Sequence, residues 1–140
     1  SYEQVFMIMR KLRLKKSDAE QQYRRMVFNV VARNLDDHTK NFAFLMTPDG
    51  NWHLSPAYDI TYAHNPKGQW TNKHQLSING KRDNISRQDL LTVADSISLT
   101  KADHVIDDVV NTIKHWPKYA EAAGVKPDFM SEIKDQLQLI

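Results

Sequence analysis

The stretch NLDDHTKN, residues 34–41, decides the fold together with the apolar segments on either side of it. The segment before it carries apolar residues at helical spacing, which predicts a helix over about residues 18–33. The segment after it, FAFLM at residues 42–46, is a short apolar run that predicts a strand. A polar run between two buried elements is costly to desolvate unless its groups serve a purpose. We therefore expect residues 34–41 to form a functional loop.

A β-hairpin is predicted directly after this loop. The residues TPDGN at 47–51 have turn chemistry, and residues 52–62 form a second strand-like stretch. The tip of the hairpin should therefore lie near Asp49 and Gly50. The residues QLSI at 75–78 predict a further short strand.

The rest of the chain has helical patterns, so the expected fold class is α+β and mainly helical. Helical spacing of apolar residues predicts helices over about residues 1–14, 86–98, 100–115 and 128–139. Ser17, Ser86 and Thr100 each precede a helical stretch and are predicted to be N-caps. The apolar stripes of these helices should close one core.

Composition limits the class of protein. A chain of 140 residues fits one domain, and its 41% hydrophobic content argues against global disorder. The absence of cysteine excludes disulfides and thiolate metal sites, and the spacing of the six histidines matches no tetrahedral zinc pattern. No apolar run approaches the roughly 20 residues of a membrane span, and no secretory signal is recognisable. We expect a cytoplasmic protein without a membrane partner.

Charge is unevenly distributed along the chain. The net charge is only +2, but residues 1–33 hold eight basic and three acidic residues. Five of the basic residues lie in RKLRLKK, residues 10–16. The favoured interpretation of this cluster is a solvated helix end, and contact with a phosphate backbone is the alternative.

Asp36 and Asn41 have the D-x-x-x-x-N spacing of a protein-kinase catalytic loop. In such a loop the aspartate accepts the proton of the substrate hydroxyl, and the asparagine holds Mg²⁺. A hairpin that turns at Gly50 would bring Asp59 opposite Asn41, and hard oxygen ligands of these types suit Mg²⁺. Asp37 is the alternative base, although the spacing to Asn41 favours Asp36, and Asp37 could instead orient the loop or lie in solvent.

Three segments together resemble the C-terminal lobe of HipA-type serine/threonine kinases, the toxin halves of bacterial toxin–antitoxin pairs. The segments are NLDDHTKNF at residues 34–42, LSPAYDI at 54–60 and HQLSINGK at 74–81, and the similarity covers about residues 20–125. The resemblance implies that Asp36 is the catalytic base and that Asn41 and Asp59 are Mg²⁺ ligands. His38 and Lys40 also occupy matching loop positions, where they face the phosphates of ATP or have a structural role.

The same resemblance implies a fold and an activity. The fold is a protein-kinase-like C-lobe in which the catalytic-loop hairpin packs on a helical bundle. The activity is ATP- and Mg²⁺-dependent phosphoryl transfer to a serine or threonine hydroxyl of a protein substrate, such as an aminoacyl-tRNA synthetase. The implied partner is a DNA-binding antitoxin, so that nucleic acid is met only indirectly.

The chain departs from the kinase pattern in one respect. Kinases cover the ATP phosphates with a glycine-rich loop and pair them with a strand lysine. None of the four glycines forms a G-x-G motif, and the strand-rich region follows the catalytic loop. We therefore expect residues 1–140 to be a fragment of a longer kinase that lacks its ATP-covering N-terminal lobe, inactive by itself. The alternative is a non-catalytic interaction module that binds an antitoxin or nucleic acid.

Overall fold

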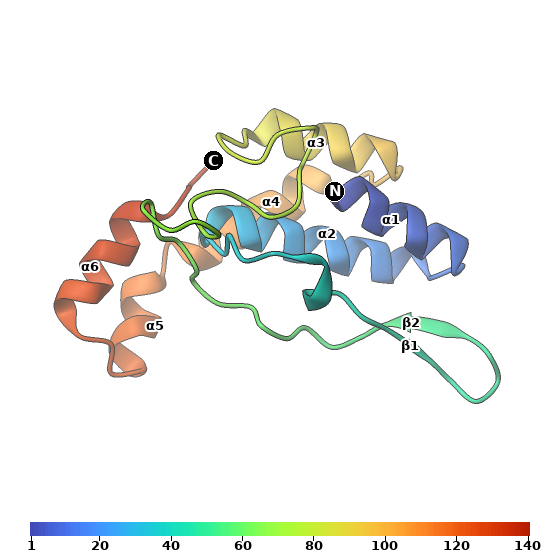
Figure 1. Cartoon of the computed structure of the whole chain (residues 1–140), viewed down its shortest axis with the longest axis horizontal. Coiled ribbons are helices and arrows are strands. Elements are labelled where there is room, and N and C mark those ends of the chain that lie inside the picture. The colour runs from blue at the N-terminus through green and yellow to red at the C-terminus, as the bar shows by residue number, and fades with distance from the viewer.

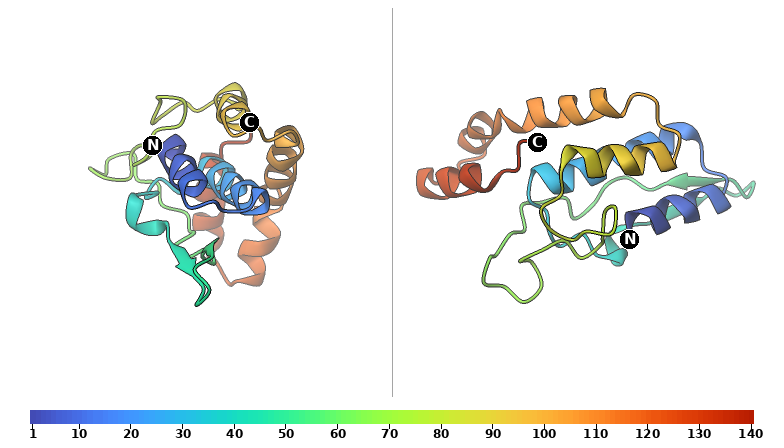
Figure 2. Two further views of the ribbon diagram at one scale, coloured as in Figure 1. Left: turned by 90° about the vertical axis from the view of Figure 1, so that its right-hand side faces the viewer. Right: turned by 90° about the horizontal axis from the view of Figure 1, so that it is seen from above.

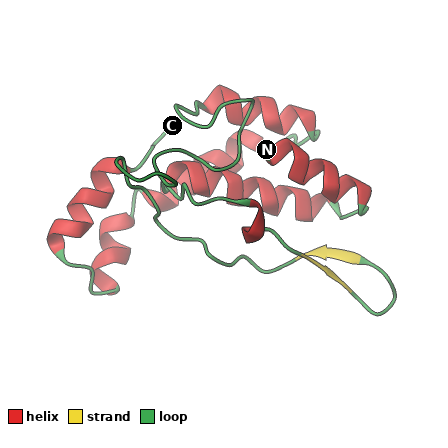
Figure 3. Ribbon diagram, viewed as in Figure 1, coloured by secondary structure: helices red, strands yellow, loops and turns green.

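The computed structural model describes residues 1–140 and confirms a mainly helical α+β chain, with six α-helices and one two-stranded sheet (Figure 3). In chain order the elements are α1 (Tyr2–Lys11), α2 (Lys16–Val31), the 3-10 helix η1 (Thr39–Asn41), β1 (Phe44–Met46), β2 (Trp52–Leu54), α3 (Arg87–Ser96), α4 (Ala102–Ile113), α5 (Trp116–Ala122) and α6 (Pro127–Gln136). None of these helices has both the length and the apolar character that crossing a bilayer requires.

Helix α2 is the central element, with α1, α3 and α4 around it (Figures 1 and 2). Its predicted apolar stripe is confirmed, because five of the six residues are buried and Ala19 is partly buried. Burial of such a side chain contributes about 1.5–3 kcal/mol, so this stripe is a main source of stability. The five buried members are Tyr23, Met26, Val27, Val30 and Val31.

One of the three predicted N-caps is correct. The Ser86 hydroxyl accepts a hydrogen bond from the backbone of Asp89, and the Asp89 side chain bonds back to Ser86. The predictions for Ser17 and Thr100 are wrong. Helix α2 begins at Lys16, so Ser17 already has helical backbone, and the residue before α4 is Lys101, whose side chain makes no capping bond.

The C-terminal helices pack mainly on each other at one end of the molecule (Figure 1). The prediction that residues 128–139 close the main core is wrong, because α6 contains no buried residue and Phe129 is 57% exposed. Helix α6 begins at Pro127, whose fixed backbone suits the first turn.

The predicted hairpin is present, and its tip is where the turn residues indicated. Strands β1 and β2 are antiparallel, with Leu45 opposite His53, and Gly50 has the positive φ of +84° that the turn requires. The second strand ends at Leu54 rather than near residue 62, because Pro56 lacks a backbone donor for the ladder. Residues 75–78 are not a strand, and Ile78 makes only an isolated bridge with Lys81.

Candidate functional site

Asp37 fixes the loop of residues 34–41 to the body of the protein. Its side chain has no solvent exposure and accepts three hydrogen bonds. The Tyr2 hydroxyl and His74 Nδ1 each lie 2.8 Å from Oδ2, and the backbone N–H of Gln75 lies 2.7 Å from Oδ1. Both oxygens of Asp37 therefore have structural partners.

The polar network continues into α2. Asn29 Nδ2 donates to the Tyr2 hydroxyl at 2.9 Å, and Asn34 Nδ2 donates to Asn29 Oδ1 at 3.0 Å. Burial, together with the negative charge of Asp37, raises the pKa of Tyr2 well above its ordinary value, which keeps Tyr2 a hydrogen-bond donor. The network therefore joins α1, α2, the loop and the segment at residues 74–75.

The neighbouring Asp36 has the opposite environment. Its side chain is 43% exposed, and the nearest cationic atom is Nε2 of His38 at 3.9 Å from Oδ1. No hydrogen bond within the chain engages its carboxylate oxygens. Because Asp37 is held inside, Asp36 is the acidic group of the pair that can meet an incoming hydroxyl.

Asn41 lies in η1 and orients its amide by a hydrogen bond within the loop. Its Nδ2 donates to the backbone carbonyl of Asp36 at 2.9 Å. This bond uses the amide's donor side and leaves Oδ1 without a donor from the chain. Asn41 and Asp59 line the same small cavity, so the structure brings these two predicted residues together.

Asp59 follows β2 on an extended segment that is tied to the loop. The Tyr58 hydroxyl donates to the Lys40 carbonyl at 2.8 Å, and Asn34 Nδ2 lies 3.4 Å from the Asp59 carbonyl. The exposed Asp59 has a φ of +53°, a left-handed conformation that aspartate tolerates better than most residues. Such outliers often occur at functional sites, where the surrounding contacts hold them.

Residues further back hold this segment. The Arg25 guanidinium on α2 donates to the carbonyl of the buried Ser55 at 2.7 Å. Burial lowers the pKa of Arg25, and nearby acidic groups such as Asp18 oppose that shift. The contact anchors the start of the segment that carries Asp59.

The two remaining predicted residues have less defined surroundings. Nδ1 of His38 is buried without a hydrogen-bond partner, and its ring lies beside Asp36. Lys40 is exposed, and its backbone carbonyl rather than its ammonium makes the contact with Tyr58. Both lie on the loop, and neither has a contact that defines a role toward phosphate.

The donor set at Asn41 and Asp59 fits Mg²⁺. The chain contains no group of three or more His, Asp or Glu side chains that could enclose a metal ion. Mg²⁺ does not need such a group, because it commonly binds one or two protein oxygens and completes its shell with water and substrate phosphates. The free Oδ1 of Asn41 and the exposed carboxylate of Asp59 are oxygens of that kind.

The sequence left the role of Asp37 open between an alternative base, a residue that orients the loop and a side chain in solvent. Its buried contacts favour the loop-orienting role. His74 was included only within a segment of family resemblance. The partners of Asp37 lie 35 and 37 positions away in the chain, so no local spacing connects them. The one available signal was the pair of adjacent aspartates. A loop that packs against the body of the protein can leave only one of the two side chains in solvent.

Comparison with known proteins gives one match. The model of the HipA-like C-terminal domain matches residues 1–137, almost the whole chain. No curated protein and no solved structure matches the chain.

Proposed function

The chain belongs to the HipA-like C-terminal domain family, and on this premise we propose that it forms the C-lobe of a kinase that phosphorylates proteins. The proposed reaction transfers the γ-phosphoryl group of ATP to a serine or threonine hydroxyl. Membership of this family also supports a role in a toxin–antitoxin system. A DNA-binding antitoxin and a protein substrate, such as an aminoacyl-tRNA synthetase, belong to the proposal.

One observation carries the assignment. The hydrogen bond from Asn41 to the Asp36 carbonyl couples the two residues of the D-x-x-x-x-N pattern. Asp36 keeps an exposed carboxylate, and Asn41 keeps a free amide oxygen. Asp59 lines the same cavity as Asn41, which supports a shared metal site.

These residues can perform the protein's share of phosphoryl transfer. Asp36 would accept the proton of the substrate hydroxyl while that oxygen forms a bond to phosphorus and the bond to the ADP oxygen breaks. Asn41 and Asp59 would hold Mg²⁺, which offsets the negative charge of the phosphates. Asp37 and His74 would keep the loop rigid, so that Asp36 is aligned before the substrate arrives.

The proposal assigns residues 1–140 to one part of a longer kinase. Catalysis by kinases depends on a second lobe that covers the phosphates and excludes water. The chain has no glycine-rich loop that could do this. The N-terminal lobe, an essential partner, would therefore come from sequence outside these 140 residues.

Phosphoryl transfer by the longer kinase tests the proposal. The rate of transfer of labelled phosphate from ATP to a protein hydroxyl is measured for the wild type and for Asp59→Asn. A lost metal ligand removes several kcal/mol of charge stabilisation, so we expect a decrease of at least about 100-fold. Asp83→Asn, which replaces another exposed aspartate, is the control and should retain the wild-type rate. An Mg²⁺-independent rate, or equal rates for both variants, would contradict the metal site.

A further inference from the structure

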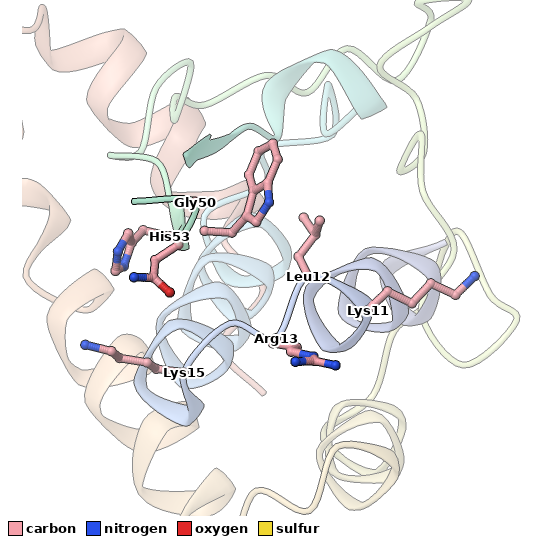
Figure 4. Close-up of a pocket in the computed structure, with 8 residues that line it drawn as sticks. Lys11, Leu12, Arg13, Lys15, Gly50 and His53 are labelled. Carbon is pink, nitrogen blue, oxygen red and sulfur yellow. The ribbon is translucent and has the colours of Figure 1, made fainter. Parts of the chain in front are cut away.

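A second cavity lies between the turn that joins α1 to α2 and the tip of the hairpin (Figure 4). It has a volume of about 510 Å³ and shares no lining residue with the cavity at Asn41 and Asp59. We call it the turn–hairpin pocket. Lys11 ends α1, Arg13 and Lys15 lie in the turn, and β2 contributes Trp52 and His53.

The turn–hairpin pocket has an unbalanced positive charge. No carboxylate lines it, and none of the three basic side chains forms a salt bridge. The hairpin tip carries Asp49, whose carboxylate accepts hydrogen bonds from Thr47 and Asn51. The single negative charge of Asp49 does not balance the three positive charges of the pocket. All three side chains are exposed, as the predicted solvated helix end requires, and three of the five clustered cations also line one cavity.

The directions of the basic side chains indicate the shape of the ligand. Figure 4 shows Lys11 and Lys15 extending in opposite directions from the turn, with Arg13 between them. Arg13 has a left-handed φ of +58°, which reverses the chain at this point. Cations that diverge cannot converge on one small ion. They suit an extended ligand with several separated negative groups.

The hairpin side adds aromatic surface to this charge. Trp52 and His53 both line the pocket and are half-buried, and as successive residues of β2 they offer two separate rings on opposite faces of the strand. Proteins that bind single-stranded nucleic acid combine a basic groove along the backbone with aromatic rings on which bases stack. A duplex hides the faces of its bases, and an acidic peptide has no base to stack. The combination of charge and rings therefore favours a single strand.

We propose that the turn–hairpin pocket binds single-stranded nucleic acid. The phosphates contact Lys11, Arg13 and Lys15, and a base stacks on Trp52 or His53. This site is separate from the proposed kinase site and does not depend on phosphoryl transfer. Through this pocket the protein contacts nucleic acid directly, and not only through an antitoxin.

Fluorescence anisotropy with the 140-residue chain tests this site. The probe is a labelled oligonucleotide of about 12 nucleotides, in DNA and RNA forms. We expect a Kd on the order of 10–100 μM near physiological salt. Three phosphate contacts predict a slope of about −2 for the logarithm of affinity against the logarithm of salt concentration.

A matched pair of triple variants locates the binding. The pocket variant combines Lys11→Gln, Arg13→Asn and Lys15→Gln. It should bind at least about tenfold more weakly, with a slope near zero.

The control variant combines Lys114→Gln, Lys118→Gln and Lys126→Gln, which remove the same charge around α5 at the opposite end of the molecule (Figure 1). Its affinity should change by less than about twofold. Circular-dichroism melts establish that both variants are folded.

Aromatic variants and competing probes distinguish the ligand classes. Trp52→Leu and His53→Ala should weaken single-strand binding and leave the salt slope unchanged, since stacking is not ionic. If Trp52→Leu does not fold, the His53 variant and the two triple variants still decide the outcome. Absence of binding, equal losses in the two triple variants, or tighter binding of a duplex or a polyglutamate peptide would overturn the proposal.

Discussion

Replacement of Asp37 by alanine should destabilise the fold, whereas the same replacement at its neighbour Asp36 should not. Asp37→Ala removes the acceptor of the Tyr2 hydroxyl, of His74 Nδ1 and of the Gln75 backbone N–H, all in a fully buried position. A hydrogen bond to a charged group contributes about 1.5–3 kcal/mol, so the upper limit of the loss is about 9 kcal/mol.

The expected loss is smaller than this limit, because the site relaxes and water enters. Each buried donor that is left without its acceptor typically costs about 1–3 kcal/mol, and we expect about 4 kcal/mol for the three donors together. Total stability of a domain is about 5–15 kcal/mol, so the variant should fold at low temperature with a markedly lower midpoint. Asp36→Ala removes an exposed carboxylate and should change stability by less than about 0.5 kcal/mol.

Urea unfolding followed by circular dichroism measures both free energies at 25 °C. The two variants remove the same group from adjacent residues, so each is the other's control. A loss below about 1 kcal/mol for Asp37→Ala, or equal losses for the two variants, would refute the description of Asp37 as a buried anchor.

Three further predictions concern Asn41, the isolated chain and Asp89. Asn41→Ala should raise the Mg²⁺ concentration required for half-maximal transfer by the longer kinase by about 10–100-fold, and an unchanged Mg²⁺ dependence would exclude Asn41 as a ligand. Isothermal titration should show that the isolated chain binds ATP·Mg²⁺ with a Kd on the order of 1 mM or weaker, about 4 kcal/mol of binding, and micromolar binding would show that no second lobe is needed. Burial acts to raise the pKa of Asp89, but hydrogen bonds from Lys81, Ser86 and Asn79 outweigh it and hold that pKa well below its usual value. The folded-state pKa is thus lower than the unfolded one, so the stabilisation by Asp89 is complete above about pH 4 and decreases as the pH falls further. Thermal melts of the wild type and Asp89→Asn should therefore differ most near neutral pH and converge in acid, whereas a difference independent of pH would contradict this role.

Local sequence patterns predicted much of the fold. The apolar stripe of α2 and the turn residues of the hairpin are short-range signals, and the structure confirms both. The N-caps were less predictable, because Ser17 and Thr100 lie within a residue or two of the true helix starts and capping depends on backbone angles that spacing does not reveal. The packing of α6 outside the main core depends on tertiary contacts, which its own apolar pattern does not contain.

The candidate site was predictable only in part. The pattern that joins Asp36 to Asn41 is local, and the hairpin extends it to Asp59, so these residues could be proposed from the sequence. The contacts of Asp37 with Tyr2 and His74 form only when α1 and the segment before α3 pack against the loop. The roles of such residues depend on tertiary structure, and no short motif describes them.

The rate of phosphoryl transfer by the longer kinase carrying Asp36→Asn tests the central claim most directly. This substitution preserves the size of an exposed side chain and removes the proton acceptor, so the fold should remain intact. Single-turnover measurements should show a decrease of about 10²–10⁴-fold, the usual contribution of general-base catalysis. A folded Asp36→Asn enzyme that transfers phosphate at nearly the wild-type rate would contradict the assignment of Asp36 as the base.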